Sequence, residues 1–510
     1  MIDKVLITNV LELKQKYGAH GYRRVRGALS DLVAADSSRC LKTQLVDISD
    51  PSQMGSYNAK AVTNPCSEVQ NKNAIDSIYA AIKPHYLVLV DGPDVIPHIL
   101  LDNKRIPGDE DKNVPSDLPY ASDERFTDIK RDAMVYAAAT RVVGRLTGVT
   151  GSNNPAFLVS QIKNAAIFKS RRRKDYLSHF AISGYSYRKS TERSVDNIFR
   201  SARMKISPPT ESPKIGKRTM APLSHFINCD GQKGDPNFYG YRNNQRPVVS
   251  MTSEAVVENA KRNTIVAAEC CYGAHLFAPT AAGGKLPIAN AYLKAGAIAF
   301  FGSTTVAYGS SDGNGSADLI AQYFLIEVLG GASIGRACLQ ARQNFVRSQK
   351  MENPVNLKTL AQFILLGDPS LQPVRSEGQV YAFAEYIDFQ EARQTRRIAL
   401  VASGQSALGC SGFPGKKIKG GKSKLHGQVR KIALKKGFKV GPNAVDAYEI
   451  VGRDNYANEM KARDVEQKVF IATHKETTTR KTFKGVPLTR ILVAHAENER
   501  LTSVSEHIRR

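Results

Sequence analysis

The sequence predicts an α/β protein with a mainly parallel sheet, helices on both faces of that sheet, and a smaller β-rich carboxy-terminal domain. The chain has 510 residues, of which 42% are hydrophobic, and single cores stop growing at roughly 250 to 300 residues, so we expect more than one domain. Short apolar runs alternate with amphipathic runs over most of the chain, which is typical of βαβ units. After "GDPSLQPV" the runs become short strands with polar alternation, which indicates the separate β-rich domain.

The strand-like runs follow one another as expected for a parallel sheet. The first clear one, His85–Gly92, follows a helical run, and later strands are predicted in "HFAISGYSY", "LSHFINCDG", "NTIVAAECC" and "AGAIAFFGS". Two helices are predicted after them, in "SADLIAQYFLIEVLGG" and "SIGRACLQARQNFVRSQK". Ligands of such sheets bind beyond the carboxyl ends of the strands.

These patterns divide the chain into five predicted segments. They are an α/β segment at 1–83 that packs on or belongs to the next domain, the main α/β domain at 84–375, a strand-rich connection at 376–415, a basic linker at 416–439, and the β-rich domain at 440–510.

The composition argues against several classes of protein. The amino-terminal stretch mixes charges into its apolar run, unlike a signal peptide, and the longest apolar runs are far shorter than the roughly 20 residues of a membrane span. We therefore expect a cytoplasmic protein without a membrane partner. The chain has seven cysteines, no pair of Cys-x-x-Cys motifs, no His-Glu-x-x-His and no phosphate-binding loop, so we expect reduced cysteines, no metal and no cofactor.

The net charge of +25 raises the question of an acidic partner. Residues 416–439 contain ten basic side chains and no acidic one. Such a run is more often a solvated linker than a binding patch for nucleic acid or an acidic protein. We favour the linker and keep nucleic acid as the weaker alternative.

Two adjacent cysteines, Cys270 and Cys271, follow a buried strand and precede Gly273. A thiolate at the carboxyl end of a central parallel strand projects into the ligand crevice, and a following glycine allows a tight turn with free N–H groups for an oxyanion. The alternative is that both are small buried apolar residues.

The motif "ECCYG" resembles the Gln-Ala-Cys-Arg-Gly of caspases. Further motifs, in the same order, resemble the gingipain-like cysteine peptidases, relatives of caspases: "HYLVLVDGPDVIPH", "VPSDLPYASD", "TRVVGRLTG", "FFGSTTVAYG" and "LAQFILLGDPSLQPV". The resemblance covers residues 84–374. It implies a caspase-like αβα sandwich and an endopeptidase that cleaves protein substrates after Arg or, less readily, Lys.

The resemblance also implies roles for single residues. Cys271 matches the nucleophile under the caspase spacing, and Cys270 matches it under the Cys-x-x-Gly spacing of other members; we prefer Cys271. The N–H groups of Gly231 and Cys271 match oxyanion donors. Asp117, in "PSDLPY", falls where arginine-specific gingipains have the carboxylate of the specificity pocket, and its alternative role is that of a turn residue.

The sequence departs from the family at its general base. The family has a histidine directly before a glycine on the strand beside the cysteine strand, and this chain has Asp230 there. An unperturbed aspartate is a poor general acid near pH 7, so we predict impaired turnover. His275, which follows the cysteine loop, is the better substitute, and its alternative role is that of a packed or solvent-facing residue. His225 lies too early on its strand. The alternative function is an inactive pseudo-protease that binds peptides, proteins or nucleic acid.

A run of arginines supplies a hypothesis about regulation. Arg171, Arg172 and Arg173 precede a predicted strand, and such charge density belongs on the surface. Because caspase-like enzymes are commonly zymogens, one hypothesis is that the chain is processed there, by the protein itself or by an upstream protease, or that a regulatory partner acts there. The alternative is that these arginines simply cap and solvate a helix. Relatives often act in prokaryotic programmed death or antiphage immunity, which is an expectation by resemblance only.

Overall fold

The computed structural model describes residues 2–375 except 104, 128–130, 243–245 and 311–312, together with residues 412–418, 423–441, 444–452, 467–475 and 489–509. Within this part of the chain, no helix has the length and apolar character needed to cross a membrane. The predicted connection at 376–415 lies outside the described residues up to 411.

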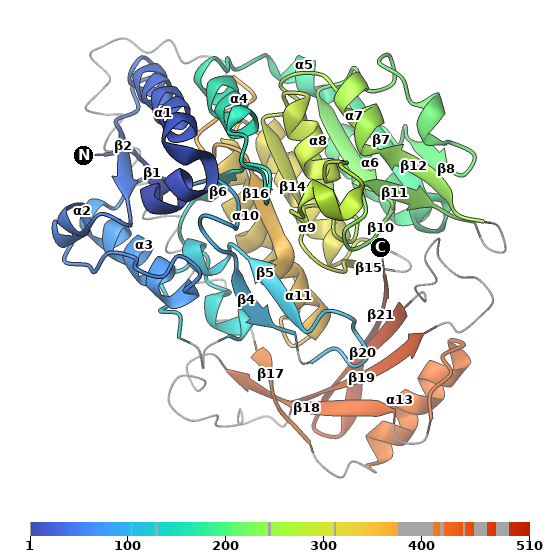
Figure 1. The fold of residues 1–510 in the computed structure, drawn as a ribbon. Coiled ribbons are helices and arrows are strands. Elements are labelled where there is room, and N and C mark those ends of the chain that lie inside the picture. Colours follow the sequence, from blue (N-terminus) through green and yellow to red (C-terminus); the bar gives the residue numbers. More distant parts are fainter. Residues whose placement is uncertain are drawn as a thin grey trace.

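A ten-stranded sheet forms the centre of the molecule (Figure 1), in the order β2-β1-β3-β6-β16-β14-β13-β9-β7-β8. Its strands are β1 (Lys4–Thr8), β2 (Thr43–Asp47), β3 (Tyr86–Val90), β6 (Val143–Leu146), β7 (His179–Gly184), β8 (Lys205–Ser207), β9 (Ser224–Asn228), β13 (Ile265–Ala268), β14 (Ala299–Ser303) and β16 (Phe363–Leu366). In the described sheet every neighbouring pair is parallel except β14 and β16. The segment 1–83 supplies two of these strands, so it shares the sheet of the main domain.

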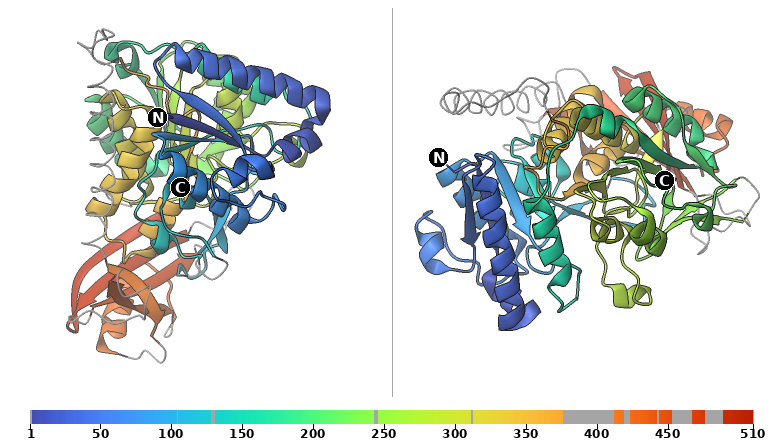
Figure 2. Two further views of the ribbon diagram at one scale, coloured as in Figure 1. Left: turned by 90° about the vertical axis from the view of Figure 1, so that its left-hand side faces the viewer. Right: turned by 90° about the horizontal axis from the view of Figure 1, so that it is seen from above.

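Helices cover both faces of this sheet (Figures 1 and 2). Contacts link α1, α4, α8 and α7 in one series and α10, α9 and α6 in another. The helices are α1 (Val10–Ser37), α2 (Pro51–Gly55), α3 (Glu68–Ile82), α4 (Ala156–Ala166), α5 (Arg173–Leu177), α6 (Arg188–Phe199), α7 (Ser253–Asn259), α8 (Ile288–Lys294), α9 (Ala317–Leu329), α10 (Ile334–Ser348) and α11 (Pro354–Gln362). Several begin at a side-chain cap; the Ser333 hydroxyl, for example, accepts the Arg336 N–H at the start of α10.

A second, antiparallel sheet lies on one side of this layered domain (Figure 2). Its order is β15-β21-β20-β19-β18-β17, with β15 (Tyr308–Ser310), β17 (Gly412–Lys417), β18 (Val445–Gly452), β19 (Gln467–Lys475), β20 (Thr489–Glu497) and β21 (Arg500–Arg509). Because β15 follows β14 in the chain, this sheet is joined to the main domain by a shared strand. The predicted fold class, a mainly parallel α/β sheet plus a β-rich carboxy-terminal region, is confirmed.

The two faces of the second sheet have different partners. Val469 and Ile471 belong to the core of the main domain, whereas Phe470 and Ala472 pack with α13 (Lys424–Lys435) on the other face. The alternation follows from the period of two along a strand. One face of this sheet is therefore docked on the main domain.

The predicted linker at 416–439 differs from the structure, because much of it is the helix α13. Leu425, Val429 and Ala433 recur every four residues and form the buried stripe of α13. The density of lysines around this stripe made the segment look like a solvated charge run.

Two small sheets and five short 3-10 helices complete the described elements. The sheets are β4 (Ile99–Asp102) with β5 (Asn113–Ser116), and β10 (Asp230–Gly231) with β11 (Asn237–Gly240) and β12 (Val248–Thr252). The 3-10 helices are η1 (Pro119–Ala121), η2 (Ala133–Tyr136), η3 (Tyr185–Tyr187), η4 (Ser212–Lys214) and η5 (Pro279–Ala282).

Candidate active site

The candidate site lies where β9 and β13 end. The two strands are neighbours in parallel register, with Ile265 opposite Ser224 and Ala268 opposite Ile227. The chain after β9 leads to Asp230, and the chain after β13 leads to Cys271. The carboxyl ends of neighbouring parallel strands meet at one edge of a sheet, so both residues come to the same place, as the sequence predicted.

The two adjacent cysteines face different surroundings. Both side chains are fully buried and belong to apolar core clusters, so the partners of the two thiols distinguish them. The Cys270 thiol accepts the Cys229 N–H at 3.2 Å and lies 3.7 Å from the Ile227 carbonyl oxygen. The Cys271 Sγ accepts the Ala307 N–H at 3.3 Å and lies 3.4 Å from the Ala307 carbonyl oxygen. Cys270 therefore contacts the backbone of β9 and the residue after it, whereas Cys271 contacts the segment before β15; the choice of Cys271 as nucleophile stays a prediction.

Burial keeps the Cys271 thiol protonated at neutral pH. It raises the pKa of this thiol to about 12, while the positive charge of Arg509 lowers the pKa and the carboxylate of Asp230 raises it. Both charges act on Cys271 across a buried site, where charges interact strongly. Any nucleophilic use of the thiol needs a group that removes its proton.

Asp230 titrates in a range that the sequence did not predict. Its side chain is buried, and burial raises its pKa to about 6, with Arg509 lowering and Glu110 and Asp235 raising that pKa. This is close to the ordinary pKa of histidine, about 6.5. The expectation of an unperturbed aspartate is thereby corrected: this carboxyl can exchange a proton near neutral pH.

The raised pKa of Asp230 predicts a stability that depends on pH. The folded protein holds this proton more tightly than the unfolded chain, where the pKa is 3.8. The contribution to stability is therefore complete below about pH 4 and is lost as the pH rises through about 6, a change of about 3 kcal/mol. Denaturant unfolding of wild type and Asp230→Asn from pH 4 to 7 should show wild type losing stability relative to the variant by about this amount. A stability difference that is constant over this range would contradict the assignment.

Gly231 allows the segment after β9 to approach the Cys271 backbone closely. A Cβ at this position would come 1.8 Å from the carbonyl oxygen of Cys271. No side chain fits there, because the neighbouring atom is backbone and cannot move aside cheaply.

We expect Gly231→Ala to destabilise the fold by about 1–3 kcal/mol or more, because it forces the two loops apart. Gly216→Ala is the matched control, since a Cβ at Gly216 meets nothing within 4 Å and its φ is not positive. Thermal unfolding of both variants is the measurement. Equal melting temperatures would contradict the close approach.

The turn after the cysteines is held in an uncommon backbone conformation. Tyr272 has φ of 54°, which a non-glycine residue adopts only when its surroundings enforce it. Its N–H donates to the Thr305 carbonyl at 2.8 Å, and the Ala274 N–H donates to the Ser303 carbonyl at 2.7 Å. The Tyr272 hydroxyl donates to the Asp111 carboxylate at 2.8 Å. These bonds hold the turn after Cys271 against the end of β14, the residues that follow it and the loop that carries Asp111.

An acidic loop borders the site, and the sequence analysis missed it. Lys358 pairs with Asp109 at 2.7 Å and with Asp111 at 3.0 Å, and Asp111 also accepts the Val306 N–H at 2.8 Å. Glu110, between the two, is 38% exposed and pairs with Arg509 at 2.8 Å. Three consecutive acids in so basic a chain were a signal that sequence analysis could have used.

An arginine side chain lies inside this site. Arg509 of β21 is only 3% exposed; its guanidinium pairs with the Glu110 carboxylate at 2.8 Å, and its carbonyl accepts the Tyr187 hydroxyl at 2.9 Å. Its pKa is raised because Cys271, Asp230 and Glu110 all favour the charged form against the cost of burial. Acidic groups and the candidate nucleophile therefore surround one guanidinium.

Comparison with known proteins supports a peptidase site. A family model aligns with the part of the chain that includes the Cys271 turn, the β14–β15 segment and the closing "GDPS" turn. Residues 231–374 match Peptidase family C25. The predicted resemblance to the gingipain-like cysteine peptidases is confirmed for this C25 region. The match begins one residue after Asp230, so it leaves that position untested.

Other comparisons add little to this match. No curated protein matches the chain. One solved structure, titled "Structure of Protease", aligns over 100% of this chain and 97% of that chain, with 11% identity and a TM-score of 0.46. A structure of the Saccharomyces cerevisiae separase–securin complex aligns over 46% of this chain and 14% of that chain, with 11% identity and a TM-score of 0.30.

Asp117 does not lie open to a ligand beside the C25 region. Its carboxylate accepts two bonds from Arg145, at 2.6 and 3.0 Å, and contacts His98 Nδ1 at 2.8 Å. These partners hold its pKa well below its usual range, although burial opposes them. The motifs "DVIPH", "PSDLPY" and "VVGRL" thus converge on one buried ionic cluster. The charge of Asp117 is already matched within the chain in this structure, and its predicted specificity role stays a prediction.

Neither candidate substitute histidine is a cation at neutral pH. His225 is in the core, where it contacts the Tyr292 hydroxyl at 2.9 Å, and burial lowers its pKa to about 4. His275 accepts the Gly234 N–H at 3.4 Å, and burial lowers its pKa also to about 4. The groups that shift the pKa of Cys271 are instead Arg509, Asp230 and Glu110, with the Ala307 N–H.

The three arginines proposed for processing are exposed. However, the Arg171 backbone bonds to Pro373 at 2.8 Å and to Arg375 at 2.7 Å, and Arg173 starts α5. Their exposure agrees with the prediction, and processing there stays a prediction.

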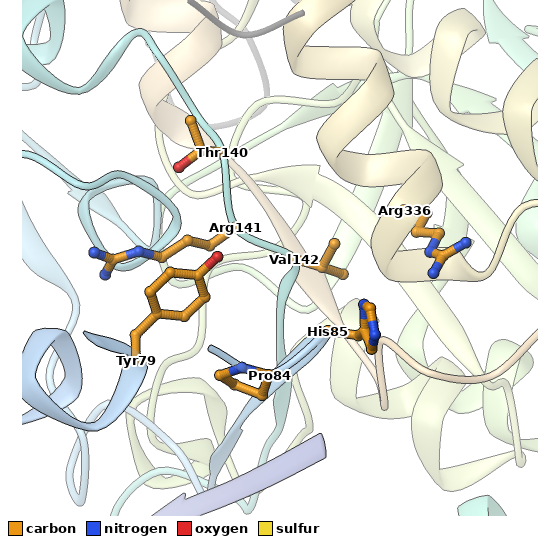
Figure 3. A pocket seen from close by; sticks show the side chains of 7 residues that line it. All are labelled: Tyr79, Pro84, His85, Thr140, Arg141, Val142 and Arg336. Carbon is orange, nitrogen blue, oxygen red and sulfur yellow. The ribbon is translucent and has the colours of Figure 1, made fainter. Parts of the chain in front are cut away.

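The described residues contain no group of three or more His, Cys, Asp and Glu side chains placed to hold a metal ion. A small pocket lies apart from the cysteine turn (Figure 3), lined by Tyr79, Pro84, His85, Thr140, Arg141, Val142 and Arg336. Its Arg141 pairs with Asp123 at 2.9 Å, and neither Cys271, Asp230 nor Arg509 lines this pocket.

Proposed function

We propose that the protein is a cysteine endopeptidase that cleaves polypeptides after basic residues, arginine in preference to lysine, with Cys271 as the nucleophile. One observation carries the proposal: the buried guanidinium of Arg509 lies on the Glu110 carboxylate, close enough to Cys271 and Asp230 to shift their pKa values. The site already holds the kind of side chain that the substrate would present.

The chemistry of the site supports arginine over lysine. A guanidinium is planar, is always charged and is more weakly hydrated than an ammonium, so it is the cation better suited to a buried position beside a carboxylate. The Arg509 side chain is 4% exposed and that of its partner Glu110 is 38% exposed, so the subsite buries the cation more than the anion. Glu110 takes the specificity role that the sequence assigned to Asp117. Lys358 pairs with Asp109 and Asp111, whereas Glu110 pairs with Arg509 and also lies 3.2 Å from the Tyr272 hydroxyl, so the substrate guanidinium would take the place of Arg509.

The reaction begins when the Asp230 carboxylate takes the Cys271 proton and the thiolate attacks the scissile carbonyl carbon. The N–H groups of Gly231 and Cys271 would stabilise the oxyanion. As the carbon–nitrogen bond breaks, the Asp230 carboxylic acid gives its proton to the leaving amine, and a thioester remains on Cys271. Water then attacks the thioester, which releases the carboxylic acid and returns the proton to the thiol.

Proton transfer limits this reaction in the present chain. The thiol, with a pKa of about 12, holds its proton far more tightly than the Asp230 carboxyl, with a pKa of about 6. The thiolate is therefore rare, and slow turnover is expected.

The same observation favours a second candidate function, a pseudo-protease that binds basic peptides without cleaving them. With the Cys271 thiol neutral, the carboxylates of the site can bind the guanidinium of a peptide while no peptide bond is cleaved. The exposed lysines of α13, Lys424, Lys431 and Lys435, offer a separate surface for an acidic partner.

Incubation of the protein with a mixed peptide library separates the two candidates. Cleavage after arginine that disappears in Cys271→Ala supports the peptidase. Binding of arginyl peptides with identical, negligible cleavage in both proteins supports the binding module.

A further inference from the structure

The last described strand of the chain enters the candidate site. Most of β21 pairs with β20 in the carboxy-terminal sheet. Its end also pairs with β15 of the main domain, with Tyr308 opposite Arg509 and Ser310 opposite His507. In Figure 1, β21 rises from the carboxy-terminal sheet, and the C mark lies beside β10 and β15.

Side-chain contacts hold this end of β21 in place. His507 contacts the Asn353 side chain at 2.8 Å and the Ser316 hydroxyl at 3.3 Å. The Arg509 guanidinium pairs with Glu110 at 2.8 Å, and the Tyr187 hydroxyl donates to the Arg509 carbonyl at 2.9 Å. Both side chains are buried, so the segment fills its site rather than lying across it.

This arrangement has the form of a bound peptide. An extended segment adds to a strand by antiparallel pairing, so that main-chain bonds give affinity and a side-chain pocket gives specificity. The strand to which it adds, β15, starts directly after Ala307, whose N–H and carbonyl contact the Cys271 thiol. Arg509, opposite Tyr308, is therefore placed next to the nucleophile along the ladder.

We infer that residues 507–509 of β21 are an internal, substrate-like ligand that closes the candidate site, with Arg509 in the subsite for the basic side chain of a substrate. A peptide substrate needs the same edge of β15 and the same Glu110 carboxylate, so it must displace these residues. The inference rests on the proposed function for the identity of that substrate. Closure of the site itself depends only on the contacts of β21.

The test compares Arg509→Ala with Arg500→Ala. Arg500 is the matched control, an exposed arginine at the other end of the same strand. The readout is the rate at which iodoacetamide alkylates Cys271, followed by peptide mapping in a mass spectrometer, which needs no turnover. Opening the site should raise this rate about tenfold or more in Arg509→Ala, because the thiol regains water, and leave it unchanged in Arg500→Ala.

Two further arms guard against a trivial loss of structure. Glu110→Gln breaks the same ion pair from the other side and should also raise the alkylation rate. The synthetic peptide Ser-Val-Ser-Glu-His-Ile-Arg, the sequence of residues 503–509, should protect Cys271 of Arg509→Ala when added in trans, and the same peptide ending in alanine should not. Protection by the peptide requires a folded site.

The outcomes separate this inference from the proposed function. Unchanged alkylation in both Arg509→Ala and Glu110→Gln, or no protection by the arginyl peptide, would overturn the inference. Faster alkylation without cleavage of arginyl peptides supports the closing strand and counts against the peptidase. If Asp230→His and the Asp230→His, Arg509→Ala double variant cleave arginyl peptides at the same rate, the peptidase is supported and the closing role of β21 is overturned.

Discussion

Replacing Asp230 by histidine is expected to raise kcat/KM for arginyl peptides by about 10²-fold or more, the usual contribution of a well-matched general acid–base. In the present chain the carboxylate beside Cys271 raises the pKa of the thiol, so the group that should accept the proton also opposes formation of the thiolate. A neutral imidazole lacks this repulsion, and once protonated it stabilises the thiolate as a cation.

The cysteines provide the controls for this experiment. In the Asp230→His background, Cys271→Ala should abolish cleavage, because it removes the nucleophile. Cys270→Ala should retain cleavage, since the Cys270 thiol contacts the Cys229 N–H and the Ile227 carbonyl on the β9 side, whereas the Cys271 thiol contacts Ala307. Cleavage that survives Cys271→Ala and disappears in Cys270→Ala would show that the other sulfur reacts. Steady-state kinetics with a fluorogenic arginyl peptide measures all three variants.

Glu110→Gln, in the same background, is expected to lower kcat/KM for arginyl peptides by about tenfold or more. A charged hydrogen bond is worth about 1.5–3 kcal/mol, and the 38% exposure of the Glu110 side chain favours the lower end of this range. The preference for arginine over an uncharged residue should shrink with it. Because the glutamine is nearly isosteric, the shape of the pocket is kept and only the charge is lost.

Asp117→Asn is the contrasting variant. Asp117 matches the buried charge of Arg145, so its loss should lower the melting temperature by leaving a cation unpaired. The ratio of kcat/KM for arginyl peptides to kcat/KM for uncharged peptides should stay the same as in the Asp230→His protein. If Asp117→Asn abolishes the arginine preference and Glu110→Gln leaves it intact, the roles of the two carboxylates are reversed.

The sheet was predictable because its strands are buried on both faces and so appear as continuous apolar runs. The neighbouring positions of β9 and β13, and with them those of Asp230 and Cys271, followed from the family motifs. The antiparallel β14–β16 pair could not be predicted, since it depends on pairing between distant segments. The same holds for the pairing of β15 with β21.

The missed parts of the site have a common physical cause. Glu110 and Arg509 come from a loop and a strand far apart in the sequence, and neither carries a local motif; only the fold joins them. Asp117 sat in the expected motif, but its role depends on Arg145, which lies in another one. The raised pKa of Asp230 arises from burial, which composition and spacing do not show.

The central claim is that Cys271 is a nucleophile beside a subsite for arginine. Its most direct test is to treat the Asp230→His, Arg509→Ala double variant with a peptidyl-arginine acyloxymethyl ketone and to locate the adduct by mass spectrometry. The account predicts one adduct, on Cys271, which a peptidyl-aspartate probe of the same length does not form. An adduct on Cys270, equal labelling by both probes, or no labelling of this folded variant would contradict it.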